Sequence, residues 1–282
     1  GFGYYGKLDS EKISIKSEIP DSINFIFNKE IDKDTIYLWL SKNILDSLAF
    51  QLQEIDTIKT LSIKFNRAKD TLIDSLRVSQ KTRSIIDLNE KFKLSSNLPI
   101  NKVSDSLIFI RNIDSILVPF KSIINKNLDE LTLDFNVEPK DDYSVNLLPN
   151  AIIDIRGGTN DTINFRTASQ SLEDYGNVYI NVILDAKSKY ILQMINSNNK
   201  IIKEYNNITN DGIYNFELIP PGKYLFRMIK DDNGNKIWDT GNYLQKIQPE
   251  DVYYFSNELD IRANWDFNET FNLKMIEIDS IN

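Results

Sequence analysis

Hydrophobic and polar residues alternate with a period of two along most of this 282-residue chain. The clearest runs lie at residues 13–15, 61–65 and 131–135, and turn-forming residues separate them. Because successive side chains of a strand point to opposite faces, such runs indicate strands that are buried on one face only. Residues 68–76 also fit helical spacing, but we expect a strand there. The sequence therefore predicts an all-β fold of tandem antiparallel β-sandwiches.

Two residue types are missing, and their absence restricts the chemistry that this chain can perform. The sequence contains no Cys and no His. Thiol nucleophiles, disulfides and Ser–His catalysis are therefore excluded, and no cofactor is expected. The net charge of −8 argues against a nucleic-acid partner, since such binding needs a basic surface.

Neighbouring acidic residues are the remaining candidates for catalysis. They form three pairs, Asp141-Asp142, Glu173-Asp174 and Glu250-Asp251. A glycosidase needs two carboxylates about 5 to 10 Å apart in one cleft, whereas adjacent residues of a strand point to opposite faces. We therefore expect no catalytic residues and no enzyme activity.

The spacing of the strand-like runs and polar stretches divides the chain into three blocks. We expect an Ig-like sandwich at residues 1–86, a bacterial Ig-like sandwich at 87–170, a transthyretin-like sandwich at 171–276 and a tail at 277–282. No run of about 20 apolar residues is present, so no transmembrane segment is expected. The chain opens at Gly1 rather than at Met, and we expect an export signal and a lipid anchor upstream.

The third block carries the most specific motif. Residues 216–227 read as two alternating strands joined by Pro220-Pro221-Gly222, with Phe216, Leu218, Tyr224 and Phe226 expected in one core. This segment resembles the transthyretin-like (prealbumin-like) family, which includes carboxypeptidase regulatory-like domains and surface-protein B-type repeats. The resemblance implies a structural or binding module.

Two further resemblances extend over nearly the whole chain. Residues 143–165 are similar to bacterial Ig-like domains of S-layer type. Residues 2–6, 34–39, 148–151 and 238–271 resemble Ig-like-domain lipoproteins of Bacteroidota. That family has no assigned catalytic residues, and its lipidated amino-terminal Ig-like domain is not in this sequence. We interpret the three tryptophans as core or corner residues, and they are Trp39, Trp238 and Trp265.

Residues 231–242 form an oxygen-rich loop that is typical of a calcium site. Oxygen-bearing side chains stand at its positions 1, 3, 5 and 9, and they are Asp231, Asn233, Asn235 and Asp239. The loop departs from the calcium pattern at Lys236, where Gly is preferred, and at Asn242, where a bidentate Glu is preferred. The alternative is a turn whose side chains bond their own backbone.

The triplet of Asp, Ser or Thr, and Ile or Leu occurs far more often than composition predicts. It is similar to the O-glycosylation acceptor of exported Bacteroidota proteins and implies attached glycan. The alternative is steric, with Asp in the turn and Ser or Thr entering a strand. The candidate acceptors are Ser22, Thr35, Ser47, Thr57, Thr71, Ser75, Ser106, Ser115 and Thr162.

Taken with these resemblances, the residues favour a non-catalytic scaffold or interaction region of an exported, outer-membrane-anchored lipoprotein. We expect it to be a subunit of an envelope protein complex that binds other outer-membrane or envelope proteins through loops or strand edges. One alternative is a carbohydrate-binding or adhesin module that stacks exposed aromatic rings on glycan. Another is a set of accessory domains of a larger exported enzyme.

Overall fold

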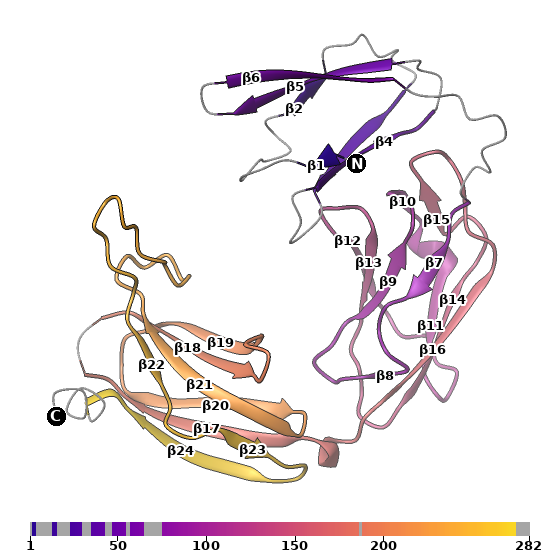
Figure 1. Cartoon of the computed structure of the whole chain (residues 1–282). Coiled ribbons are helices and arrows are strands. Elements are labelled where there is room, and N and C mark those ends of the chain that lie inside the picture. Colours follow the sequence, from indigo (N-terminus) through magenta and orange to yellow (C-terminus); the bar gives the residue numbers. More distant parts are fainter. Residues whose placement is uncertain are drawn as a thin grey trace. The chain divides into compact units, whose positions relative to one another are not determined.

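The computed structural model of the chain describes residues 2–3, 13–15, 23–29, 35–42, 47–54, 57–64, 75–185 and 188–274. Contacts divide the chain into two compact units, Gly1–Ser169 and Gln170–Asn282. Nearly all regular structure in the described residues is β-strand (Figure 1). In that part of the chain, no helix is long and apolar enough to cross a lipid bilayer.

The first part of the Gly1–Ser169 unit contains two three-stranded antiparallel sheets. One has the order β1-β4-β3, with β1 at Phe2–Gly3, β4 at Thr35–Leu40 and β3 at Phe25–Lys29. The other has the order β2-β5-β6, with β2 at Ile13–Ile15, β5 at Ser47–Glu54 and β6 at Thr57–Lys64. Residues 65–74, which include most of the ambiguous stretch, lie outside the described residues.

The remainder of this unit is a β-sandwich. One sheet has the order β12-β13-β9-β7, formed by Lys121–Ile124, Glu130–Asp134, Phe92–Ser96 and Val78–Gln80. The other has the order β11-β14-β16-β8, formed by Ile108–Arg111, Asp142–Leu147, Ile163–Ser169 and Ile85–Ile86. A two-stranded sheet pairs β10 (Ile100–Val103) with β15 (Ile152–Asp154). A single 3-10 turn, η2 (Asp105–Leu107), precedes β11.

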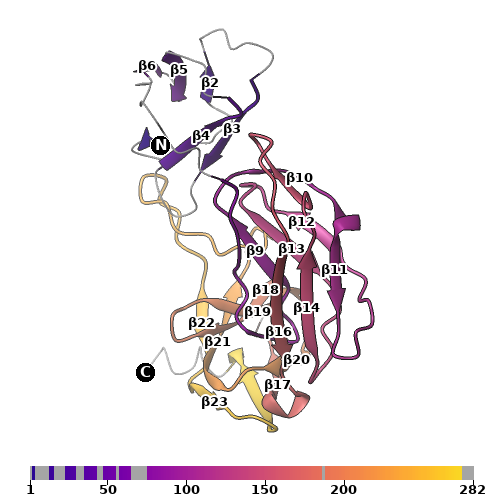
Figure 2. The same ribbon diagram turned by 90° about the vertical axis from the view of Figure 1, so that its right-hand side faces the viewer.

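Alternating side chains of both sheets fill one core between them. Phe92, Leu94, Leu131 and Leu133 come from one sheet and are fully or almost fully buried. Ile110, Val145 and Leu147 face them from the other sheet. Figures 1 and 2 show β9 and β13 in one layer and β11 and β14 in the other. The alternation predicted at residues 131–135 is thus confirmed.

Residues 78–86, which the sequence analysis assigns to the first block, pair with strands of this sandwich. Strand β7 is antiparallel to β9, and β8 is parallel to the last strand, β16. The polar stretch between β7 and β8 crosses from one sheet to the other, so it is a loop inside the sandwich. The division of the chain into blocks otherwise stays a prediction.

The Gln170–Asn282 unit is a second sandwich. One sheet has the order β20-β17-β24, formed by Gly212–Ile219, Gly176–Ile183 and Asp266–Asn272. The other has the order β19-β18-β21-β22, formed by Ile201–Ile208, Tyr190–Asn196, Gly222–Lys230 and Val252–Tyr254. Strand β23 (Leu259–Ile261) also pairs with β21, and the 3-10 turn η3 (Leu172–Asp174) opens the unit.

The predicted pair of strands around the Pro-Pro-Gly turn is confirmed, with β20 ending at Ile219 and β21 starting at Gly222. Phe216 and Phe226 lie in the core with ring centroids 5.0 Å apart. The placement of Leu218 in that core is wrong. Leu218 has a positive φ of 56°, and the pairing with β17 is irregular here, so Ile219 fills the core instead.

The expected fold class, an all-β chain of tandem β-sandwiches, is confirmed. Two strand pairs depart from the antiparallel pattern, since β8 runs parallel to β16 and β24 runs parallel to β17.

Candidate functional site

The longest connection of the second sandwich is the β21–β22 loop, residues 231–251. It projects beyond the ends of the strands that it joins (Figure 1). At its base lies Asp231, whose side chain is 1% exposed. Its Oδ1 accepts hydrogen bonds from the backbone N–H groups of Gly234 (2.8 Å) and Asn235 (3.1 Å), and its Oδ2 accepts one from Lys236 (3.0 Å). One carboxylate therefore shapes the first turn of the loop.

The other three candidate calcium ligands bond within the same turn. Asp239 Oδ2 accepts hydrogen bonds from the side-chain amides of Asn233 and Asn235. The side-chain oxygens of those two residues accept N–H groups two residues further on, from Asn235 (2.9 Å) and Ile237 (2.8 Å). All four predicted residues are thus brought together in one hydrogen-bonded turn.

These contacts form the side-chain-to-backbone turn that the sequence analysis holds as the alternative to a metal site. Lys236, at the position where the calcium pattern prefers Gly, does adopt a positive φ of 67°. Among the described residues, no group of three or more acidic side chains is arranged to hold a metal ion. Calcium binding by this loop stays a prediction.

Glu250 is a second buried carboxylate at the base of the loop, at 9% exposed. Its two oxygens accept the N–H groups of Asp232 and Asp239, both at 3.0 Å. Its carbonyl oxygen accepts the indole N–H of Trp238 at 3.1 Å. In the sequence, Glu250 stands out only as one of an acidic pair, because nothing in the local pattern links it to Asp239 and Asp232, 11 and 18 positions earlier.

Carboxylates of the other acidic pairs also bond backbone groups. Asp141 Oδ1 accepts the N–H groups of Ile113 (3.0 Å) and Asp142 (2.8 Å). Asp174 closes a capping box at η3, where its Oδ2 accepts the N–H of Ser171 at 2.8 Å. One carboxylate of each acidic pair thus accepts hydrogen bonds from backbone N–H groups, which is a structural role.

A second projecting feature is the apolar loop of the first unit, residues 112–117, between β11 and β12. Its three large aliphatic side chains are strongly exposed: Ile113 at 63%, Ile116 at 61% and Leu117 at 58%. Backbone bonds close the loop, from Ser115 N to Asn112 O (2.9 Å) and from Asn112 N to Ile116 O (3.1 Å). Sequence reasoning missed this surface, since the alternation of apolar residues does not distinguish an exposed aliphatic residue from a core one.

The nine candidate glycosylation residues lie in different environments. Ser22 and Thr71 fall outside the described residues. The candidates with exposed side chains are Ser75, Ser106, Ser115 and Thr162. Thr35, Ser47 and Thr57 are the first residues of β4, β5 and β6, which is where the steric alternative places them. Both interpretations thus stay open, and glycan attachment stays a prediction.

The tryptophans are not core residues. Trp238 is 45% exposed and Trp265 is 54% exposed, while Trp39 is half-buried. Trp238 is fixed at the loop base by its hydrogen bond to Glu250, and the Arg262 guanidinium lies 5.3 Å from the Trp265 ring centre. The description as corner residues therefore fits better than the description as core residues.

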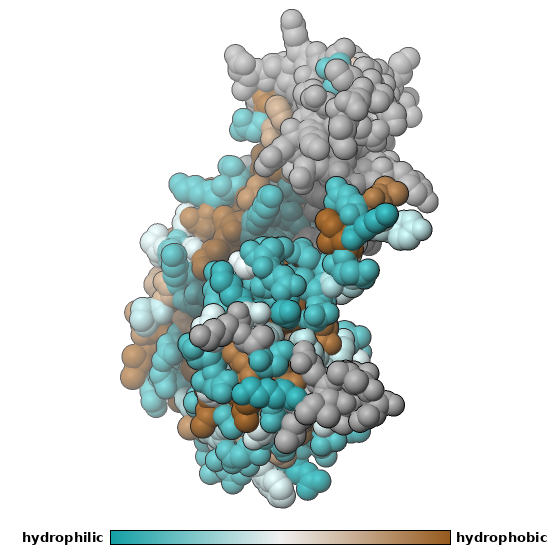
Figure 3. Space-filling model, turned by 90° about the vertical axis from the view of Figure 1, so that its left-hand side faces the viewer, coloured by the Kyte–Doolittle hydropathy of each residue, from teal (hydrophilic) through white to brown (hydrophobic). Residues whose placement is uncertain are grey.

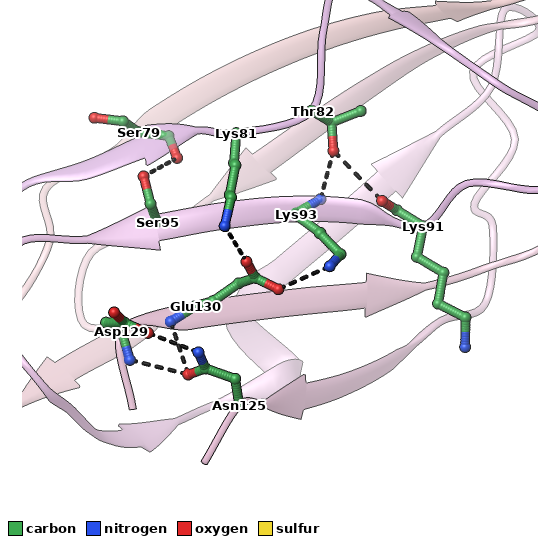
Figure 4. Close-up of polar contacts among 9 residues, drawn as sticks. All are labelled: Ser79, Lys81, Thr82, Lys91, Lys93, Ser95, Asn125, Asp129 and Glu130. Atoms are coloured by element: carbon green, nitrogen blue, oxygen red, sulfur yellow. Dashed lines mark hydrogen bonds and ion pairs between the residues drawn. The ribbon is translucent and has the colours of Figure 1, made fainter. Parts of the chain in front are cut away.

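A charged cluster covers the outer face of the β12-β13-β9-β7 sheet. Lys81 and Lys93 reach Glu130 from neighbouring strands, at 2.6 and 3.0 Å (Figure 4). Burial works to raise the pKa of Glu130, but hydrogen bonds from both lysines outweigh it, so this pKa lies below its ordinary value. The hydrogen bond between Lys81 and Glu130 also raises the pKa of Lys81. The cluster links β9, β13 and Lys81, which follows β7.

A cavity of about 610 Å³ lies beside this cluster. Its walls combine two aromatic side chains with amides, carboxylates and lysines, and the side chains are Asn28, Tyr37, Trp39, Lys81, Lys93, Asn97, Asn125, Asn127, Asp129 and Glu130. The rings of Tyr37 and Trp39 have centroids 6.3 Å apart and planes 30° apart. Aromatic faces beside hydrogen-bonding groups are the elements with which proteins bind sugars.

The sequence matches no protein-family model and no curated protein. Solved structures with some likeness include native alpha-2-macroglobulin from Escherichia coli, at 12% identity and a TM-score of 0.31, covering 65% of this chain and 71% of that one. The major pilin subunit of Bacillus cereus is 10% identical with a TM-score of 0.23, covering 88% and 93%.

A Bacteroides ovatus protein of a mixed-linkage glucan utilization locus, solved with a mixed-linkage heptasaccharide, is 12% identical with a TM-score of 0.22. It covers 90% of this chain and 67% of that chain. These TM-scores are too low to support any inference about the function of this chain.

Proposed function

We propose that this chain is a non-catalytic interaction region of an exported, outer-membrane-anchored lipoprotein and a subunit of an envelope protein complex. The observation that carries the proposal is the apolar loop at residues 112–117. Large apolar side chains held out in water by a closed backbone turn are typical of protein-binding surfaces. The resemblance to Bacteroidota lipoproteins supports the cellular location.

The mechanism is passive. The sandwiches hold the loops in fixed conformations, so little conformational entropy is lost when a partner covers them. Burying Ile116 and Leu117 in a partner would contribute about 1.5–3 kcal/mol each before that ordering cost is subtracted. The lack of His and Cys in the sequence supports a role without catalysis.

A native pull-down tests this function. The full-length protein is tagged in its own organism, the outer membrane is solubilised gently, and co-purifying proteins are identified by mass spectrometry. We expect stoichiometric recovery of envelope proteins, and loss of that recovery in the double variant Ile116→Ser/Leu117→Ser. A matched control is Ile85→Ser/Ile123→Ser, which removes two exposed aliphatic residues elsewhere in the same unit. Recovery of the wild-type protein alone would contradict the proposal.

The second candidate function is carbohydrate binding in the cavity beside Glu130. The observation that favours it is the combination of Tyr37 and Trp39 with amide and carboxylate groups around one cavity. Screening the wild-type chain on a glycan array, followed by calorimetry with any ligand found, tests this function. Trp39→Ala should abolish binding, whereas Trp265→Ala should leave it unchanged. Failure of the wild-type chain to bind any glycan would remove this candidate.

A further inference from the structure

The tip of the β21–β22 loop, residues 242–247, exposes three large apolar side chains, Tyr243, Leu244 and Ile247. Tyr243 is 95% exposed and Leu244 is 91% exposed, so both side chains are almost entirely in solvent. Ile247 at the tip is 56% exposed, and Ile237, nearer the loop base, is 65% exposed. Figure 3 shows hydrophobic side chains exposed among hydrophilic ones on the face from which the loop projects.

The tip has a defined conformation. Asn242 and Ile247 exchange two backbone hydrogen bonds, at 2.9 and 3.0 Å, and close a short hairpin around Tyr243 and Leu244. Just below the tip the two arms almost touch, since a Cβ on Gly241 would lie 2.8 Å from the Ile247 carbonyl oxygen and 2.9 Å from Pro249. The buried carboxylates of Asp231 and Glu250 fix the base. The apolar side chains are therefore presented on a stiff projection.

The charge of the tip differs from that of the whole chain. Residues 240–249 contain one lysine, Lys246, and no acidic residue, although the chain carries a net charge of −8. The acidic residues of the loop lie at its base, together with Lys236, and they are Asp231, Asp232, Asp239, Glu250 and Asp251. A tip that combines Tyr, Leu and Ile with one lysine and no carboxylate is complementary to anionic headgroups above an apolar layer.

We propose that the tip of the β21–β22 loop inserts into the surface of a lipid bilayer that contains anionic lipid. Leu244 and Ile247 enter the acyl boundary, Tyr243 lies at the headgroup level, and Lys246 contacts lipid phosphates. A convex tip needs no complementary pocket in a lipid surface, whereas a protein partner would have to provide a groove. The inference does not depend on the protein complex proposed above.

Vesicle co-sedimentation tests this proposal with the full 282-residue chain. The vesicles are made of phosphatidylcholine alone or of phosphatidylcholine with phosphatidylglycerol, at about 1 mM lipid because a single small anchor binds weakly. We expect binding that is stronger with phosphatidylglycerol. The variant Tyr243→Ser/Leu244→Ser should lower the partition coefficient about tenfold or more, and Lys246→Gln should reduce the preference for anionic vesicles.

The matched control is Leu172→Ser/Ile213→Ser, which removes two exposed apolar side chains elsewhere in the same unit and should bind as the wild type does. Equal loss of binding in the control would overturn the proposal. So would the absence of vesicle binding by the wild type, or self-association that depends on Tyr243 and Leu244 without lipid. The last result would assign the tip to a second copy of the chain.

A fluorescence measurement locates the inserted segment. Because the chain contains no Cys, Gln245→Cys gives a single attachment point at the tip for an environment-sensitive dye. We expect a blue shift and a rise in emission when anionic vesicles are added, and no change for the same dye on Ser197→Cys. An unchanged spectrum at position 245 in a sample that does bind vesicles would place the contact elsewhere and overturn the inference.

Discussion

At the scale of single residues, two buried carboxylates hold the longest loop of the second unit in its conformation. Asp231 accepts three backbone N–H groups and Glu250 accepts two. A carboxylate that accepts several backbone N–H groups satisfies the donors of an irregular loop that has no strand partner. The loop at residues 231–251 therefore owes its conformation to two side chains that are 19 positions apart.

Replacing Asp231 should destabilise the second sandwich. Asp231→Ala removes the side-chain acceptor of the Gly234 and Lys236 N–H groups, whereas the Asn235 N–H keeps the Asn233 oxygen. We expect a loss of about 2 kcal/mol in the free energy of unfolding. Asp232→Ala is the control, since the Asp232 side chain makes only a 3.8 Å ion pair with Lys230. Urea unfolding of both variants measures the difference, and equal stability of the two would contradict the assigned role of Asp231.

The calcium hypothesis makes a separate prediction. If Asp231, Asn233, Asn235 and Asp239 bind calcium, about 1 mM calcium should raise the Tm of the wild type and not that of Asp239→Asn. Thermal melting in calcium and in chelator measures this. An identical melting curve in the two buffers would contradict calcium binding by this loop.

Ser115 is the candidate acceptor whose surroundings give the clearest test of glycosylation. It is exposed in the apolar loop between Ile113 and Ile116, with φ at 62°. We expect the protein purified from its own organism to be heavier than its sequence mass, and Ser115→Ala to lose one glycan increment. Ser197→Ala, an exposed serine without a preceding Asp, is the control. An intact mass equal to the sequence mass would remove the glycan hypothesis.

At the scale of elements, ion pairs link strands on the outer face of the first sandwich. Glu130 on β13 contacts Lys93 on β9 and Lys81, which follows β7. Three segments are thus joined through one carboxylate whose pKa is lowered in the folded state. The stabilisation by this carboxylate is complete above its ordinary pKa, near 4.5, and is lost as the pH falls through the lower folded value.

Glu130→Gln should therefore be less stable than the wild type at pH 6, and the gap in Tm should close as the pH falls below about 4. Thermal melting of both proteins from pH 6 to 3 measures the gap. Glu173→Gln, in the exposed 3-10 turn η3, is the control and should have the same Tm as the wild type at every pH. A Tm gap for Glu130→Gln that is constant over this range would show that the ion pairs do not stabilise the fold.

Much of the element pattern could be predicted from the sequence, because alternation reports directly on which face of a strand is buried. The runs around Leu131 and Phe216 are examples. The core position of Ile219 could not be predicted, because the positive φ of Leu218 breaks the alternation there. The exposure of Trp238 and Leu244 could not be predicted either, because burial depends on which segments fold over a residue and not on the residue type alone.

At the scale of the whole molecule, the chain is built from units with separate cores. The hydrophobic clusters of the described residues, with the side chains packed against them, lie within residues 76–165 and 178–273. Each core is closed by strands of its own unit, so each should fold without the other.

The fragment Gln170–Asn282 tests this independence. We expect it to be soluble, with a β-rich circular dichroism spectrum and a Tm within a few degrees of the corresponding transition in the full chain. The variant Phe216→Ala should lower that Tm in the fragment and in the full chain alike, because the ring lies in the core of this unit alone. An unfolded fragment would show that the second sandwich needs the rest of the chain.

The parallel pair of β17 and β24 gives the second sandwich a mechanical property. Among the described residues, the first strand of this unit lies beside the last one, with partners from Asn177 and Asp266 to Ile183 and Asn272. A pull applied to the two ends of the unit draws these strands past each other along their length. Force then loads the hydrogen bonds of the ladder together in shear instead of opening them one at a time. Such a unit resists tension along the chain, which suits a protein held between a fixed anchor and a moving partner.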